Sequence, residues 1–189
     1  MSELGSAITL QFPATPAAET QPPISHWIEP AALREVLRNV PVPVAVLTTA
    51  VDDRRDGMTI SSFMTVALEP PLVAVSLTMA KPATSLTLEA GCFAINLLDG
   101  RDHATADRFA SHHSLPRFDG LAVEIGPRGL PTLTDAIAVL FASVVNVVAA
   151  GDHYLITGEV FAFCNNGGVP LIRHQSRYTQ PVLDCLAAE

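Results

Sequence analysis

Hydroxyl and ammonium side chains are grouped in the second quarter of the sequence in a way that could bind an anion. Thr59, Ser61 and Ser62 follow one another closely, and Lys81, the only lysine, stands with Thr84 at the start of a predicted helix. A desolvated phosphate needs hydroxyls, backbone N–H groups and often a cation, and a helix N-terminus supplies free N–H groups. Hydroxyls near turns more often cap the backbone, and a lysine is commonly solvated, so the residue types alone leave both interpretations open.

The histidines raise the question of a metal site. His112 and His113 are adjacent in a predicted loop, and His103 precedes them. Adjacent side chains on a loop point apart, and no carboxylate or cysteine stands at a supporting spacing, so we predict no metal site. There is no local Ser-His-Asp or Cys-His arrangement, although a dispersed one stays open. A glycine-rich dinucleotide fingerprint and a Walker-type loop are also missing, so any nucleotide would bind in another geometry.

The composition limits the classes of protein to be considered. The 189 residues suffice for one domain with a sizeable core. The chain is 49% hydrophobic and only 16% charged, which is apolar for a soluble monomer and favours a homodimer that buries part of its surface. A net charge of -8 argues against binding to nucleic acid or to an anionic membrane.

The cysteines and the apolar runs bear on location. Cys92, Cys164 and Cys185 show no metal spacing and cannot all pair, which is typical of a reduced, cytoplasmic protein. The N-terminus lacks a basic segment followed by an apolar run, so we expect no secretory signal. The longest apolar run, near residues 136–150, contains Ser143 and Asn146 and falls short of a membrane span.

The hydroxyls lie on a stretch with a period of two. Apolar residues at positions 58, 60, 64, 66 and 68 share one face of a predicted strand that should pack on a core, and Phe63 falls on the hydroxyl face. Pro70 and Pro71 cannot donate to a sheet and predict a corner. The residues from Leu72 to Val75 are apolar on both faces, as in a strand that is covered on both sides.

Most of the remaining chain also predicts short strands. We expect an N-terminal arm over 1–25, one domain over 26–180 and a tail over 181–189. Many short strands with brief helices favour a mainly β protein with an antiparallel barrel. Helices are predicted at 30–39, 81–90 and 101–110, a loop at 112–120, a turn at 165–168, and strands at 42–49, 93–97, 121–125, 138–148, 154–163 and near 171.

Three short motifs occur in a specific order. Gly57-Met58-Thr59, Ser61-Ser62-Phe63 and Pro70-Pro71-Leu72 together resemble the flavin reductase-like family, the small reductases of two-component monooxygenases. The resemblance extends from about Leu33 to Tyr178. It implies an FMN-binding split β-barrel that dimerises with the flavin near the subunit interface. It also implies reduction of FMN, or of FAD, by NADH or NADPH, and delivery of the reduced flavin to a partner monooxygenase.

The resemblance also assigns residues to a flavin site. Thr48 matches a threonine that lies near the flavin ring in relatives. By residue type and position alone, Phe63 could form a wall of the ring and Asn96 could bond its polar edge. Ordinary roles remain open for them: a strand-end threonine, a core aromatic and a turn cap. With the resemblance, a phosphate role is favoured for the hydroxyls. The expected flavin contacts are Thr48, Thr59, Ile60, Ser61, Ser62, Phe63, Lys81, Thr84 and Asn96.

Other matching positions concern the nicotinamide nucleotide. His153 precedes a Gly-Glu-Val strand and would lie on the nicotinamide side, where it could stack on the ring or bond its carboxamide. Arg177 and Tyr178 end the closing motif and would meet the flavin or the nucleotide. Many relatives carry a serine shortly before the threonine that matches Thr84. Here proline and alanine stand at 82 and 83, so one phosphate contact departs from the pattern.

Two alternative functions remain compatible with the sequence. One is a flavoprotein oxidoreductase that keeps its FMN and acts on another small substrate. The other is a non-catalytic flavin-binding protein. Turnover of added free flavin would separate the reductase from the first, and rapid NADH oxidation would exclude the second.

Overall fold

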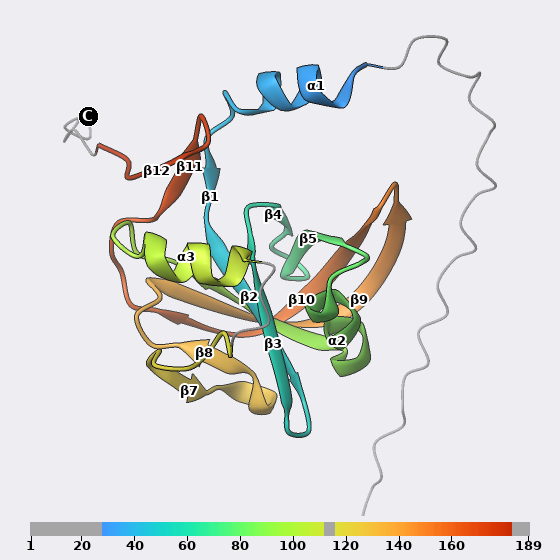
Figure 1. Ribbon diagram of the computed structural model, residues 1–189. Helices are drawn as coiled ribbons and strands as arrows, with labels where there is room; N and C mark the ends of the chain where they lie inside the picture. Colours follow the sequence, from blue (N-terminus) through green and yellow to red (C-terminus); the bar gives the residue numbers. More distant parts are fainter. Residues whose placement is uncertain (1–27, 112–115, 183–189) are drawn as a thin grey trace, which may run out of the picture.

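A seven-stranded antiparallel sheet forms the centre of the protein (Figure 1). The computed structural model describes residues 28–111 and 116–182. The expected mainly β architecture is confirmed, since every strand pair in this sheet is antiparallel. In spatial order, the strands are β3 (Arg54–Ile60), β2 (Ala45–Val51), β6 (Cys92–Leu97), β9 (Ala138–Ala150), β10 (His153–Asn165), β5 (Leu72–Thr78) and β4 (Phe63–Ala67).

The connection from β3 to β4 curls this sheet into a barrel. These two strands form the opposite edges of the sheet, yet only Ser61 and Ser62 join them along the chain. Two residues cannot cross a flat sheet of seven strands, which lie about 4.8 Å apart, so the edges must approach each other. β3 and β4 are not paired, and the barrel is therefore split between them.

Within the described residues, two small sheets and three helices complete the fold. The helices are α1 (Pro30–Leu37), α2 (Pro82–Ala90) and α3 (His103–Ala110). The expected end of α2 is confirmed: Gly91 has a φ of 64°, a left-handed conformation that suits glycine. The small sheets contain β1 (Val42–Pro43), β11 (Ile172–His174) and β12 (Arg177–Thr179), and β7 (Val123–Ile125) with β8 (Pro131–Leu133), joined by the 3₁₀ turn Pro127–Gly129. The short strands β8 and β12 were not predicted.

The core has two parts because side chains of the central strands alternate between two faces. Leu47, Phe93 and Ile156 belong to the barrel interior. Phe109 of α3 and Phe141 of β9 belong to the second part, on the outer face of the sheet. The helix α3 is thereby fixed against the outer face of the sheet, where it also contacts β3, one of the two strands that border the split.

The predicted continuous strand from 57 to 68 is wrong in its second half. Ile60 is buried, but Met64 is 60% and Leu68 81% exposed. Phe63, expected on the hydroxyl face, packs against the barrel interior. The strand is interrupted at residues 61–62. Ile60 and Phe63 therefore point into the same core although they are three positions apart, and the alternation of inward and outward side chains shifts by one residue.

Some predictions fall outside the described residues. These are the N-terminal arm over 1–25, the pair His112-His113, and the tail with Cys185, apart from residues 181 and 182. Within the described part of the chain, no helix has both the length and the apolar character needed to span a bilayer.

Candidate functional site

The split between β3 and β4 opens into a groove of about 400 Å³. It is surrounded by residues of the Ser61-Ser62 connection, of β5, of the start of β10 and of the β11–β12 hairpin. The structure thus brings together six residues predicted for the site. These are Thr59, Ile60, Ser61, Ser62, His153 and Tyr178, with Ser76, Thr78 and Arg173 as neighbours that were not predicted.

The hydroxyl groups of the groove donate to the backbone. Thr59 Oγ1 donates to the carbonyl of Ala106 at 2.6 Å, and Ser62 Oγ donates to that of Ser76 at 2.6 Å. With its hydrogen so engaged, each hydroxyl oxygen can only accept from a ligand. A phosphate needs donors, so in this arrangement the two hydroxyls suit the polar edge of a ring that carries N–H groups better than a phosphate.

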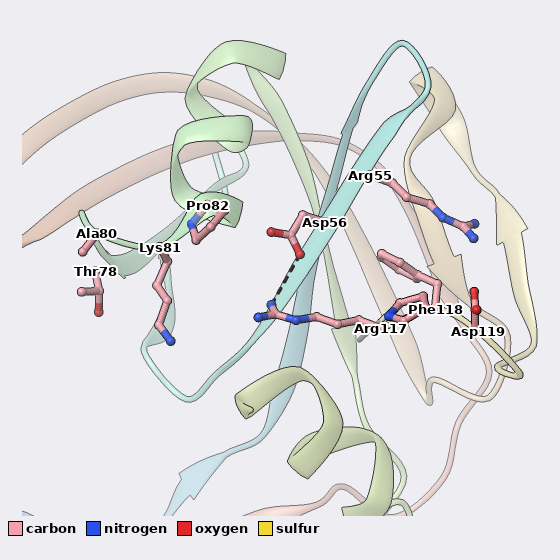
Figure 2. Close-up of a pocket in the computed structure, with 10 residues that line it drawn as sticks. Arg55, Asp56, Thr78, Ala80, Lys81, Pro82, Arg117, Phe118 and Asp119 are labelled. Carbon is pink, nitrogen blue, oxygen red and sulfur yellow. Dashed lines mark hydrogen bonds and ion pairs between the residues drawn. The ribbon is translucent and has the colours of Figure 1, made fainter. Parts of the chain in front are cut away.

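A second cavity, of about 630 Å³, adjoins the groove at Thr78, which lines both. Arg55, Lys81 and Arg117 line it, and Figure 2 shows the Lys81 and Arg117 side chains directed into the same space. Three of the eleven lysines and arginines therefore line one pocket of a protein whose net charge is -8, together with the carboxylates of Asp56 and Asp119. Such a local excess of cations attracts an anion.

Arg117 is held in place by several acceptors. Its guanidinium contacts Asp56 Oδ1 at 3.4 Å and the carbonyl of Ser111 at 3.1 Å, and it also bonds the carbonyl of Gly57. The guanidinium of Arg55 lies 4.8 Å from the centre of the Phe118 ring, a cation–π contact. Neither arginine was predicted as a site residue from the sequence. For Arg117, no local motif links this position to a strand 60 positions earlier.

Thr84 lies outside both cavities. Its side chain is fully buried, and its Oγ1 donates to the carbonyl of Thr78 at 2.8 Å. Its backbone N–H donates to the carbonyl of Lys81 at 3.0 Å. The expected phosphate contact is therefore not supported: this hydroxyl closes the turn that leads into α2.

Thr48 and Asn96 are also fully buried and line neither cavity. Asn96 Nδ2 donates to the carbonyl of Val46 at 3.0 Å and to Thr48 Oγ1 at 3.1 Å, and Asn96 Oδ1 accepts from the backbone N–H of Leu133 at 2.9 Å. Thr48 Oγ1 donates to the carbonyl of Pro131 at 2.5 Å. The pair joins β2, β6 and β8, which corrects the expectation that either residue contacts the flavin ring.

Two further residues that were expected to contact the flavin or the nucleotide do not line the groove. Phe63 packs on the barrel interior, and Arg177 is exposed on β12 and does not line the groove. Arg173, paired with Tyr178 across the hairpin, lines it instead. The Tyr178 hydroxyl donates to Asp107 Oδ1 at 3.1 Å, and burial together with this carboxylate raises the pKa of Tyr178.

His153 occupies the junction of groove and pocket. Its Nδ1 lies 2.6 Å from Asp152 Oδ1, and its Nε2 lies 3.1 Å from Thr78 Oγ1. The bond to the imidazole lowers the pKa of Asp152, because it stabilises the carboxylate. Both ring nitrogens are thus engaged, and the imidazole offers a ligand its face and C–H edge. Within residues 28–111 and 116–182, no three His, Cys, Asp or Glu side chains are grouped to hold a metal ion.

Comparisons with known proteins identify the family. Residues 37–181 match the family model of the flavin reductase like domain. The chain is 32% identical over 134 residues to a flavin reductase of Pseudomonas putida, covering 70% of this chain and 78% of that one. It is 34% identical over 161 residues to an NADH-dependent flavin reductase of Rhodococcus sp, covering 82% and 88%.

Solved structures show the same architecture. The flavin reductase PheA2 superposes with a TM-score of 0.76 at 30% identity, over 82% of this chain and 99% of that one. The Streptomyces globisporus NADH:FAD oxidoreductase SgcE6 superposes with a TM-score of 0.77 at 25% identity, over 85% and 99%. The split barrel, the groove at its split and the match over residues 37–181 lead to one conclusion: the chain belongs to the flavin reductase-like family.

Proposed function

We propose that this protein is an NAD(P)H:flavin oxidoreductase that transfers a hydride from NADH to FMN. The observation that carries this proposal is that the groove and the pocket that contains Lys81 share Thr78 as a lining residue. A groove lined by hydroxyls beside a pocket with three cations is chemically complementary to a planar polar ring that is joined to a phosphate. Family membership and the names of the relatives, among them an NADH:riboflavin 5'-phosphate oxidoreductase of Streptomyces pristinaespiralis, support the proposal.

The residues present fit a flavin mononucleotide. Thr59, Ser61 and Ser62 would face the ring, and Lys81 would hold the phosphate. A bound flavin supplies the hydride-accepting chemistry. The protein aligns the two ligands and excludes water, so it needs no acid or base for the hydride step.

We further propose that the reduced flavin passes to a partner monooxygenase in the cytoplasm. Relatives include the reductase subunit HsaB of a flavin-dependent monooxygenase from Rhodococcus jostii, 30% identical over 153 residues. The proposal also includes a homodimer. Met64 of β4, Leu68 in the turn after it and Phe163 of β10 are exposed, and a second copy would cover them.

The deciding experiment is steady-state oxidation of NADH by the purified protein at increasing concentrations of FMN, FAD and riboflavin. We expect saturable turnover of free flavin, with the lowest KM for FMN. A tightly held flavin that is reduced once, with no turnover of added flavin, would indicate a flavoprotein oxidoreductase on another substrate. A visible spectrum of bound flavin that NADH does not bleach would indicate a non-catalytic flavin-binding protein.

A further inference from the structure

A further cavity, of about 420 Å³, lies between α1 and the β11–β12 hairpin. Arg34 of α1, Arg38 directly after this helix and Arg173 of β11 line it, so we call it the arginine groove. Among the described residues that line it there is no aspartate or glutamate, whereas two carboxylates line the pocket that contains Lys81. The arginine groove therefore has the larger excess of positive charge, and its volume is within the roughly 300–1,000 Å³ typical of small-molecule sites.

The backbone brings these arginines together. Positions 34 and 38 are four residues apart on one helix face, and the Arg38 N–H donates to the carbonyl of Arg34 at 3.1 Å. The Gln175 N–H donates to the carbonyl of Arg38 at 2.8 Å, which joins the end of α1 to the hairpin turn. Arg173 is the register partner of Val42 on β1, the strand that follows α1 (Figure 1). The three side chains are thus neighbours because β1 pairs with β11.

The positive charge of the arginine groove is only partly balanced by the protein. Arg38 forms an ion pair with Glu35, and both side chains of this pair are exposed. Within residues 28–111 and 116–182, neither Arg34 nor Arg173 forms an ion pair with a carboxylate. Like charges that the fold holds near one another repel, so a bound anion would stabilise this arrangement.

Apolar side chains line the same cavity. Leu37 is 56% and Val40 51% exposed, and Val42 lines the groove with them. A ligand that covered these side chains would gain free energy from the burial of apolar surface. Arginine also stacks on planar rings. The arginine groove therefore suits a phosphate that is joined to a flat base.

The arginine groove adjoins the groove at the split through Arg173, which lines both. The groove at the split shares Thr78 with the pocket that contains Lys81, so it has two cationic neighbours. In the proposed function, the single phosphate of FMN occupies the pocket of Lys81. The phosphates that FMN lacks belong to the adenylate half of NADH, NADPH or FAD.

We propose that the arginine groove is an adenylate subsite. Its three arginines would bind the phosphate groups of an adenine nucleotide, and Leu37 with Val40 would contact the base. The choice of an adenylate among possible anions rests on the proposed function, because the dinucleotides of that reaction carry this group. No sequence motif assigned a role to α1.

Binding of AMP to the FMN-loaded protein tests the subsite without catalysis. We would titrate AMP and adenosine by calorimetry into the wild type and into Arg34→Met, which removes the charge and keeps a long apolar side chain. Arg34→Lys keeps the charge. The matched control is Arg54→Met, which removes one charge from the exposed pair with Glu89, outside the arginine groove.

We expect the wild type to bind AMP more tightly than adenosine, and Arg34→Met to weaken AMP roughly 5- to 30-fold. This is less than for a buried charged pair, because the Arg34 guanidinium is exposed. Adenosine affinity should change little in this variant. Arg34→Lys should keep most of the AMP affinity, Arg54→Met should match the wild type, and FMN affinity should stay constant throughout.

Matched ligand pairs distinguish the two sources of the adenylate. NADH is compared with reduced nicotinamide mononucleotide by KM, and FAD is compared with FMN by affinity. If the hydride donor supplies the adenylate, Arg34→Met should raise the KM of NADH alone. If the flavin supplies it, the variant should weaken FAD alone. Either result supports the subsite.

Three results would overturn the inference while the proposed function stands. These are an unchanged AMP affinity in Arg34→Met, a wild type that binds AMP no more tightly than adenosine, and an equal loss of AMP and FMN affinity. If Arg34→Met changes the mass in light scattering and AMP affinity stays constant, the groove belongs to a subunit contact and the inference also fails. A wild type that binds AMP through Arg34 and does not oxidise NADH would reject the proposed function and retain the adenylate subsite.

Discussion

At the scale of single residues, most cations of the site line the pocket and most of its hydroxyls line the groove, where Arg173 adds one cation. The hydroxyls of Thr59 and Ser62 donate to backbone carbonyls, whereas Lys81 brings an ammonium group into the larger pocket. A phosphate accepts hydrogen bonds and carries negative charge, so we propose that the pocket recognises the phosphate and the groove recognises the ring.

Lys81→Met should therefore weaken FMN binding far more than riboflavin binding. Loss of a hydrogen bond to a charged group costs about 1.5–3 kcal/mol, so we expect FMN affinity to fall roughly 10- to 150-fold. Fluorescence titration with both flavins measures the difference. Arg54→Met is the matched control, because it removes one charge from an exposed pair with Glu89 that lines neither cavity. An equal loss for both flavins would exclude Lys81 from the phosphate site.

Thr84→Val should act on stability and leave the flavin preference unchanged. It removes the buried bond from Oγ1 to the Thr78 carbonyl, which still accepts from the N–H of Lys81 at 3.3 Å. We expect unfolding in urea to show a loss of about 0.5–1.5 kcal/mol. Thr84→Ser keeps the hydroxyl and serves as the control. A selective loss of FMN over riboflavin would restore Thr84 to the phosphate site.

At the scale of the elements, a buried polar pair fixes how the strands meet. Asn96 on β6 bonds to β2 on one side and to β8 on the other. The short strand β8 thus has a fixed place against the sheet, although it spans only three residues. Because a buried amide must be fully bonded, this position tolerates few other residues.

Asn96→Ala should lower the free energy of unfolding by about 2–4 kcal/mol, because it leaves the buried N–H of Leu133 without its partner and opens a cavity. Urea denaturation measures the loss. Asn39→Ala, at an exposed amide that bonds the carbonyl of Val36, should change stability by less than about 0.5 kcal/mol. FMN affinity of the folded Asn96→Ala protein should match the wild type, and a selective loss of FMN would return Asn96 to the flavin site.

At the scale of the whole molecule, apolar side chains remain at the surface of the sheet edge. Met64 and Leu68 are exposed in the segment that follows the serines of the groove. None of the residues of α1 is buried, and Figure 1 shows this helix apart from the barrel. An eight-residue helix without tertiary packing is marginal in water. Both features are explained if a second copy covers this side of the barrel.

Leu68→Asp should therefore dissociate the proposed homodimer. We expect light scattering at micromolar concentration to give twice the chain mass for the wild type and the single chain mass for the variant, because a buried charge opposes association. Ile125→Asp, at a side chain that is 70% exposed on β7, should leave the mass unchanged. A wild-type monomer with flavin bound would contradict the dimer.

Local features of this fold followed from the sequence because neighbouring residues determine them. The start and end of α2 depend on Pro82 and Gly91, and the turn between β4 and β5 depends on Pro70 and Pro71. The order of the three short motifs was likewise enough to predict the family, and with it the groove that contains Thr59, Ser61 and His153.

Other features were decided only by contacts between distant residues. The split at Ser61 and Ser62 exists because β3 and β4 take opposite edges of one sheet, and no local pattern encodes strand order. Asn96 was predicted to contact the flavin ring, whereas its side chain accepts a hydrogen bond from the backbone of β8, a strand distant in the sequence. Arg117 joins the pocket from 60 positions beyond the Gly57 carbonyl that it bonds. Spacing along a chain reports which side chains share a face, whereas the side chains that meet across a cavity depend on how the sheet closes.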